Sequence, residues 1–159
     1  MLDALQNFTE SMPSYLQWLG VIVAGAIPFI ESYFGAVIGV MAGMNTATAI
    51  AAAVTGNIAT MLAMVLGAHT VRSRFGRPAA EASPKRRRLR EAFDKYGIAG
   101  VSLLGQTILP SQITSAALVS FGAPKNKVIF WQLISIILWG TAFGLLAAVG
   151  VDLIVDDQA

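Results

Sequence analysis

Four long stretches without charged side chains constrain the fold of this chain more than any other feature. Residues 11–30, 32–71, 96–124 and 128–151 contain no Asp, Glu, Lys or Arg. Several of these stretches exceed the roughly 20 apolar residues that a helix needs to cross a bilayer. Only 13% of the 159 residues are charged, whereas soluble domains carry about 25%. The sequence therefore predicts an all-α integral membrane protein.

The basic residues are concentrated in one region of the chain. Nine of the eleven Lys and Arg residues lie in 72–95, and the other two are Lys125 and Lys127. Short loops of membrane proteins carry their Lys and Arg on the cytoplasmic side. We therefore expect 72–95 to be a basic cytoplasmic linker.

Two threadings through the membrane are compatible with the apolar stretches. In one, four conventional helices cross, and Lys125 and Lys127 lie outside. In the other, 15–43 and 98–122 enter and return on one side, while 46–70 and 128–151 cross. The second threading places all eleven basic residues inside and the C-terminus outside. It predicts a multi-pass protein of the cell (inner or plasma) membrane.

A proline lies near the middle of each segment that is expected to return. Pro28 and Pro110 each remove a backbone donor and clash with the preceding helical turn, so a helix break is expected at both. The sequence around Pro110 is polar, "GQTILPSQITS". Non-helical backbone at membrane depth is tolerated where it is buried in protein or lines a cavity. Two re-entrant helical hairpins that face each other are therefore expected.

The same order, a broken hairpin followed by one transmembrane helix, occurs in both halves of the sequence. Interrupted segments at matching positions of two inverted halves indicate the central site of a transporter. The alternative is that any four apolar segments look alike. The expected single membrane domain has five parts: an N-terminal interfacial segment (1–14), a first repeat (15–71), the basic linker (72–95), a second, inverted repeat (96–152) and an acidic tail (153–159).

Short motifs in both halves resemble one membrane-protein superfamily. The stretch "GQTILPSQITSAALVSFGAPKNKVIFWQLISIILWG" is similar to the second hairpin and following span of the DedA (SNARE-associated, VTT-domain) superfamily. The combination of "GAIP", "TGN", "KYG" and the Pro110 hairpin is most similar to its small multidrug export branch. The resemblance covers roughly residues 20–150. It implies facing re-entrant hairpins, a homodimer, and proton-linked transport of a small molecule or a lipid carrier.

The chain departs from the family pattern at two places. Gln106 and Gln112 stand where DedA-type members carry two arginines beside the hairpin proline. Arginine holds a phosphate through a charge-assisted fork, and glutamine does not. The multidrug branch often has Glu-Leu-Arg before "GAIP", whereas Ile22, Val23 and Ala24 are found here. The acidic residue of this chain instead follows the proline, at Glu31.

Glu31 is the candidate for proton or cation coupling. A carboxylate at membrane depth costs at least about 2–3 kcal/mol on insertion scales, so an acid there indicates a role. Burial favours the neutral form of a carboxyl group, which suits a residue that accepts and releases a proton. We expect it to face Gln106 and Gln112. The alternative role is to stabilise the N-terminus of the helix that follows the Pro28 break.

Polar and helix-breaking residues define the expected substrate path. They could instead satisfy the backbone groups that the breaks expose, and Asn57 could make a purely structural hydrogen bond. The residues are Pro28, Asn57, Gln106, Thr107, Pro110, Ser111 and Gln112.

The "KRRRLR" run is expected to contact anionic lipid headgroups, each basic residue contributing about 1 kcal/mol near the surface. The orientation signal explains these residues, so nucleic acid is not expected as a partner. The contact residues are Lys85, Arg86, Arg87, Arg88 and Arg90. The chain has one histidine and no cysteine, and it shows no Ser-His-Asp set or phosphate-binding glycine loop. We expect no enzyme activity, cofactor or metal site.

The sequence thus favours a small-molecule or multidrug exporter, proton-coupled, with a site at the membrane midplane between two hairpins. One alternative is a flippase or scramblase for a phospholipid or polyprenyl phosphate. A second alternative is a membrane scaffold that transports nothing.

Overall fold

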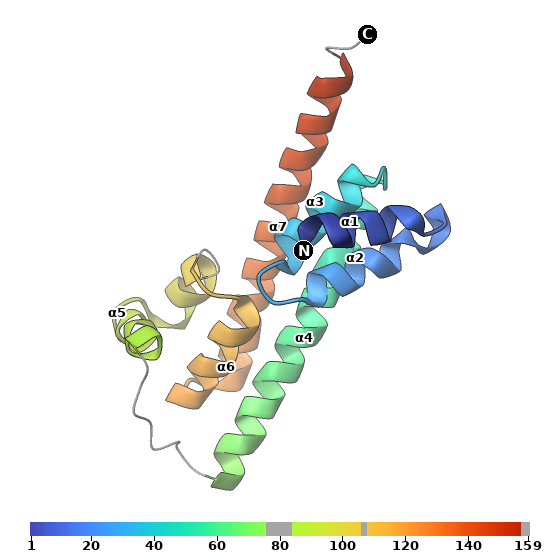
Figure 1. Ribbon diagram of the computed structural model, residues 1–159. Helices are drawn as coiled ribbons and strands as arrows, with labels where there is room; N and C mark the ends of the chain where they lie inside the picture. The colour runs from blue at the N-terminus through green and yellow to red at the C-terminus, as the bar shows by residue number, and fades with distance from the viewer. Residues whose placement is uncertain (76–83, 106–107, 157–159) are drawn as a thin grey trace. The chain divides into compact units, whose positions relative to one another are not determined.

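The computed structural model describes residues 1–75, 84–105 and 108–156, and every regular element within these ranges is helical. The prediction of an all-helical protein is therefore confirmed. The elements, labelled in Figure 1, are α1 (Leu2–Ser11), the 3₁₀ turn η1 (Ser14–Leu16), α2 (Gln17–Ala26), α3 (Glu31–Met41), α4 (Thr46–Phe75), α5 (Pro84–Gly105), α6 (Ser111–Phe121) and α7 (Lys125–Asp156).

Two of these helices are long and apolar enough to cross a membrane. They cover Thr46–Phe75 and Lys125–Leu153. At a rise of 1.5 Å per residue, α4 and α7 are about 45 and 48 Å long, and a bilayer core is about 30 Å thick. Both correspond to segments that the sequence predicts to cross.

The helix breaks predicted at the two prolines are confirmed. The helix α2 ends at Ala26, and Pro28 lies in the turn that precedes α3. Pro110 is the N-cap of α6, with φ −54° and ψ 141°. Proline fixes φ near −65° and has no N–H, so it begins a helix easily but cannot continue one.

The described chain divides into two compact units. Unit 1 comprises Met1–Ala59 and Ile136–Ala159, and unit 2 comprises Thr60–Ser135. Unit 1 contains α1, η1, α2, α3, the first part of α4 and the last part of α7. Unit 2 contains the rest of α4, then α5, α6 and the start of α7.

Glycine and alanine form the packed centre of unit 1. A Cβ added at Gly25 on α2 would collide with the Ala53 carbonyl on α4, and one at Gly35 on α3 would lie 3.2 Å from the Gly25 Cα. A Cβ added at Gly56 would collide with the Ile22 carbonyl. The three helices approach this closely only because these positions lack side chains.

A glycine in the left-handed conformation ends the second arm of each broken pair. Gly43 (φ +80°) follows α3 and donates its N–H to Val40 O, while Gly122 (φ +115°) follows α6 and donates to Val119 O. Met44 and Ala123 donate to carbonyls one residue further back, Gly39 O and Leu118 O. This is the Schellman arrangement, in which glycine reverses the chain and satisfies the last helical carbonyls.

Part of the basic linker is helical. The helix α5 begins at Pro84, inside the predicted 72–95 linker, and it kinks at Gly97 (φ 69°, ψ −171°). The polar part before the kink carries two exposed i,i+4 ion pairs, Arg87–Glu91 at 3.6 Å and Arg90–Asp94 at 3.7 Å. The apolar part, 98–105, packs against α6.

Candidate functional site

The backbone is strained where the chain passes from α2 to α3 in unit 1. Phe29 has φ +73° and Glu31 has φ +56°, and neither is glycine. Left-handed backbone costs a residue with a side chain about 1–3 kcal/mol, and such strain concentrates at functional sites. This turn is therefore the first candidate site that the structure offers.

Glu31 is fully buried in this strained turn. Its exposed fraction is 0%, and its backbone N–H donates to Ile27 O at 3.1 Å. It is the first residue of α3, where the positive end of the helix dipole stabilises a carboxylate. Proton or cation coupling by Glu31, and its alternative role at the start of the helix, both stay predictions.

Ser32 holds the start of α3 against α7. Its Oγ donates to Ile136 O at 2.8 Å, both groups are buried, and a Cβ added at Gly140 would lie 3.0 Å from the Ser32 Cβ. This bond joins residues 104 positions apart in the chain. No local pattern predicts this bond, because a serine beside a charged residue is common in helices of every kind.

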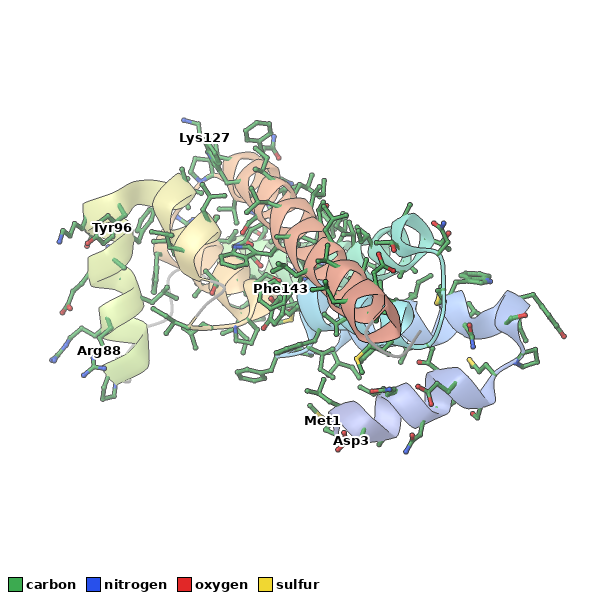
Figure 2. All side chains as sticks on the ribbon, turned by 90° about the horizontal axis from the view of Figure 1, so that it is seen from above. Met1, Asp3, Arg88, Tyr96, Lys127 and Phe143 are labelled. Carbon is green, nitrogen blue, oxygen red and sulfur yellow. The ribbon has the colours of Figure 1, made fainter. Side chains whose placement is uncertain are left out.

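An aromatic cluster lies next to Glu31 in unit 1. The ring of Phe143 on α7 is 5.5 Å from that of Tyr33 and 6.2 Å from that of Phe34, measured between centroids. Trp139 adds a fourth ring, 6.0 Å from Phe143. Figure 2 labels Phe143 on α7. Tyr33 and Phe34 follow the buried acid by two and three residues in α3, so aromatic rings lie near the start of this helix.

Asn57 and Pro28, both predicted in the substrate path, belong to the same unit as Glu31. Asn57 is fully buried in α4, beside the close contact between Gly56 and Ile22. Pro28 is exposed in the turn. Unit 1 therefore holds one buried acid and one buried amide, with the proline at its surface.

The remaining predicted path residues belong to unit 2. Ser111 and Gln112 are buried at the start of α6, directly after Pro110. The Ser111 Oγ donates to Gln112 Oε1 at 3.5 Å, and the Gln112 Nε2 donates to Thr60 Oγ1 on α4 at 3.3 Å. Gln106 and Thr107 lie outside the described residues. That Glu31 faces the hairpin glutamines stays a prediction.

Sequence reasoning missed further buried polar residues in unit 2. Ser102 on α5 and Gln132 and Ser135 on α7 have exposed fractions of 0%. Ser135 Oγ donates to Ser102 O at 2.7 Å. Gln132 could have been noticed, because it is the one amide in the apolar stretch 128–151, and polar groups inside such helices are costly unless they are paired or functional.

The basic residues of α5 differ in their surroundings. Arg90 stands over the Phe121 ring, 5.3 Å from its centroid, and also pairs with Asp94. Arg87 pairs with Glu91, and Arg88 is exposed and projects away from the helix (Figure 2). The side chains of Lys85 and Arg86 lie outside the described residues. Contact with anionic lipids stays a prediction for all five.

Comparisons with protein-family models, with curated proteins and with solved structures found no match to this chain. In the part of the chain that the structure describes, no group of three or more His, Cys, Asp or Glu side chains could hold a metal ion.

Proposed function

We propose that this protein is a multi-pass membrane transporter in which Glu31 couples the movement of a small molecule to that of protons. One observation carries the proposal: a carboxyl group that is fully buried at a strained helix break. The chain that contains it also has two helices of membrane-spanning length. Its resemblance to the DedA superfamily, and to the small multidrug export branch in particular, points to the same class of protein.

The lengths of the broken arms support re-entrant hairpins. The helices α2 and α3 have 10 and 11 residues, so each is about 15–17 Å long, well short of the 30 Å of a bilayer core. The apolar part of α5 and the whole of α6 are equally short. Arms of this length enter a membrane and return, while α4 and α7 cross it.

The positive-inside rule then sets the topology. With the basic residues of 72–95 and Lys125 and Lys127 in the cytoplasm, α4 and α7 run in opposite directions through the membrane. The two halves become inverted repeats, and the C-terminus lies outside. A homodimer remains the expected assembly.

The position of Glu31 accommodates both of its protonation states. Burial favours the neutral acid, while the N-terminal end of α3 stabilises the carboxylate. A coupling residue must take up and release a proton in each cycle. Neither protonation state can therefore be much higher in free energy than the other. The strained turn at Phe29 and Glu31 is the segment whose backbone can relax when the proton is lost or gained.

Transport in proteoliposomes tests the proposal. Purified protein is reconstituted, a pH gradient is imposed, and the movement of a lipophilic cation such as ethidium is followed. We expect Glu31→Gln to abolish gradient-driven movement and leave the protein folded, because glutamine keeps the size of the side chain but binds no proton. Glu10→Gln, an exposed acid on α1, is the matched control. Normal coupled transport by Glu31→Gln would contradict the proposal.

The flippase alternative is tested in the same vesicles with a fluorescent phospholipid. Wild-type protein that equilibrates the lipid between leaflets, without moving the cation, would favour a lipid flippase or scramblase. Activity in neither assay would favour the non-transporting scaffold.

A further inference from the structure

The interior of unit 2 contains hydrogen-bonding atoms that no described residue satisfies. The atoms are Ser102 Oγ on α5, Thr114 Oγ1 on α6, and both Nε2 and Oε1 of Gln132 on α7. All three side chains have exposed fractions of 0%. Buried polar groups in folded proteins are almost always hydrogen-bonded, so four such atoms in one unit need an explanation.

Direct contacts link the three helices that carry these atoms. Ser135 on α7 donates to Ser102 O on α5, and Gln132 lies three residues before Ser135, on the same face of α7. Gly105 lies three residues after Ser102, and a Cβ added there would be 3.5 Å from the Thr114 Cγ2. These contacts show that the three helices carrying the unsatisfied atoms pack together in unit 2, and we refer to Ser102, Thr114 and Gln132 as the α5–α6–α7 polar layer.

The hydrogen-bonding groups of this layer determine which kind of ligand fits. A hydroxyl group both donates and accepts, and a carboxamide offers two donor hydrogens and an acceptor oxygen. Ser102, Thr114 and Gln132 are uncharged, so nothing in the set compensates an ion. A small uncharged molecule that both donates and accepts hydrogen bonds fits these groups.

We propose that the α5–α6–α7 polar layer of unit 2 is a binding site for an uncharged hydrogen-bonding ligand, either water or a small polyol. Such a ligand would satisfy Ser102, Thr114 and Gln132 together, as buried water does at polar sites in other proteins. The proposal is independent of the transport function, and its test measures no transport.

Cysteine reactivity tests the site directly, because the natural chain contains no cysteine. Gln132→Cys is compared with Val128→Cys, which lies one turn earlier on α7 and is also fully buried. Purified protein in detergent is treated with hydroxyethyl methanethiosulfonate, and labelling is followed by mass spectrometry. We expect position 132 to react about tenfold faster or more, because only the thiolate reacts and apolar burial suppresses its formation. Equal, slow rates at the two positions would overturn the proposal.

Adding erythritol separates the two sources of the ligand. Slower labelling at position 132 and an unchanged rate at 128 would identify a polyol site. An unchanged rate at 132 would identify water as the occupant.

A second variant keeps the proposal falsifiable if the cysteine variants do not fold. Gln132→Leu removes two of the four unsatisfied atoms and nearly preserves side-chain volume. In a layer that binds a ligand, leucine displaces the partner of Ser102 and Thr114, and we expect the melting temperature to fall. An unchanged or higher melting temperature would show a dry layer and contradict the proposal.

Discussion

The two units use the same order of elements to build different interiors. In each, a helix breaks near a proline, an 11-residue helix follows, and a left-handed glycine leads into a long helix. Inside unit 1, Gly25, Gly35 and Gly56 allow close contacts between helices. The interior of unit 2 includes the buried polar side chains of Ser102, Thr114 and Gln132 beside apolar residues.

The two units show that the same order of helices can enclose interiors of different composition. Short helices joined at a proline need only a break, a cap and a surface on which to pack. Small side chains let the backbones of unit 1 touch, as they do in membrane helices generally. The buried polar side chains of unit 2 require hydrogen bonds. We therefore expect unit 1 to be rigid around one buried acid. In unit 2 we expect the buried polar side chains to exchange hydrogen-bond partners.

The largest effect is expected for Gly56→Ala, at a close contact between helices in unit 1. The added methyl would collide with the Ile22 carbonyl, and backbone cannot yield as a flexible side chain can. We expect a loss of about 3 kcal/mol in the free energy of unfolding, at the upper end of overpacking costs. The measurement is chemical denaturation in detergent.

The control lies on the same helix. A Cβ at Gly67 would meet nothing within 4 Å, so Gly67→Ala should stabilise α4 by about 0.5–1 kcal/mol through helix propensity. Equal effects of the two substitutions would mean that unit 1 is not closely packed.

A medium effect is expected for two buried serine bonds that join different helices, that of Ser32 in unit 1 and that of Ser135 in unit 2. Ser32→Ala leaves Ile136 O without its side-chain donor and should cost about 1–2 kcal/mol. Ser135→Ala removes the same kind of bond to Ser102 O, but a ligand in the polar layer can replace it, so we expect a smaller loss. Ser120→Ala, whose Oγ bonds only within its own helix, is the control. A larger loss for Ser135→Ala than for Ser32→Ala would contradict the expectation that a ligand in unit 2 replaces the lost bond.

A smaller effect is expected at the end of α6 in unit 2. Arg72 Nη1 donates to Val119 O at 3.1 Å, so it places a cation at the negative end of the helix dipole. Arg72→Met should cost about 0.5–1 kcal/mol, and part of that loss should disappear at high salt. Arg74→Met, at an exposed position two residues on, should change little. A loss at Arg74 as large as that at Arg72 would rule out the capping role.

The smallest effect is expected for the exposed ion pairs of α5. Arg87→Gln breaks the pair with Glu91, in which both side chains are more than half exposed. Solvent screens such pairs, so the free energy of unfolding should change by less than about 0.5 kcal/mol. A larger change would show that this helix packs more closely than its exposure indicates.

Proline and hydropathy made the main elements predictable. Pro28 and Pro110 act on their own backbone, so local rules were enough to place the two breaks, and long apolar runs were enough for α4 and α7. The helix that begins at Pro84 was not expected, and the contact of its Phe93 ring with that of Phe121 is one that no local pattern predicts.

The interior of each unit was harder to predict. Glu31 was noticed because a charge stands out in an apolar run, but the positive φ of Phe29 and Glu31 follows from packing. The bonds of Ser32 and Ser135 join residues 104 and 33 positions apart, and no local pattern in the sequence predicts such pairs. Gln132 stands out in the sequence as an amide in an apolar stretch. Its part in a polar layer follows only from the positions of Ser102 and Thr114 in the structure.

Labelling the two ends of α7 tests the membrane arrangement on which the transporter proposal depends. Asn126 and Asp152 are both exposed, near opposite ends of this helix. Cysteine is placed at one or the other, and intact cells are treated with a thiol reagent that cannot cross the membrane. We expect labelling at 152 and protection at 126. Labelling at 126 with protection at 152 would place Lys125 and Lys127 outside, and the re-entrant hairpins and their inverted repeat would be wrong.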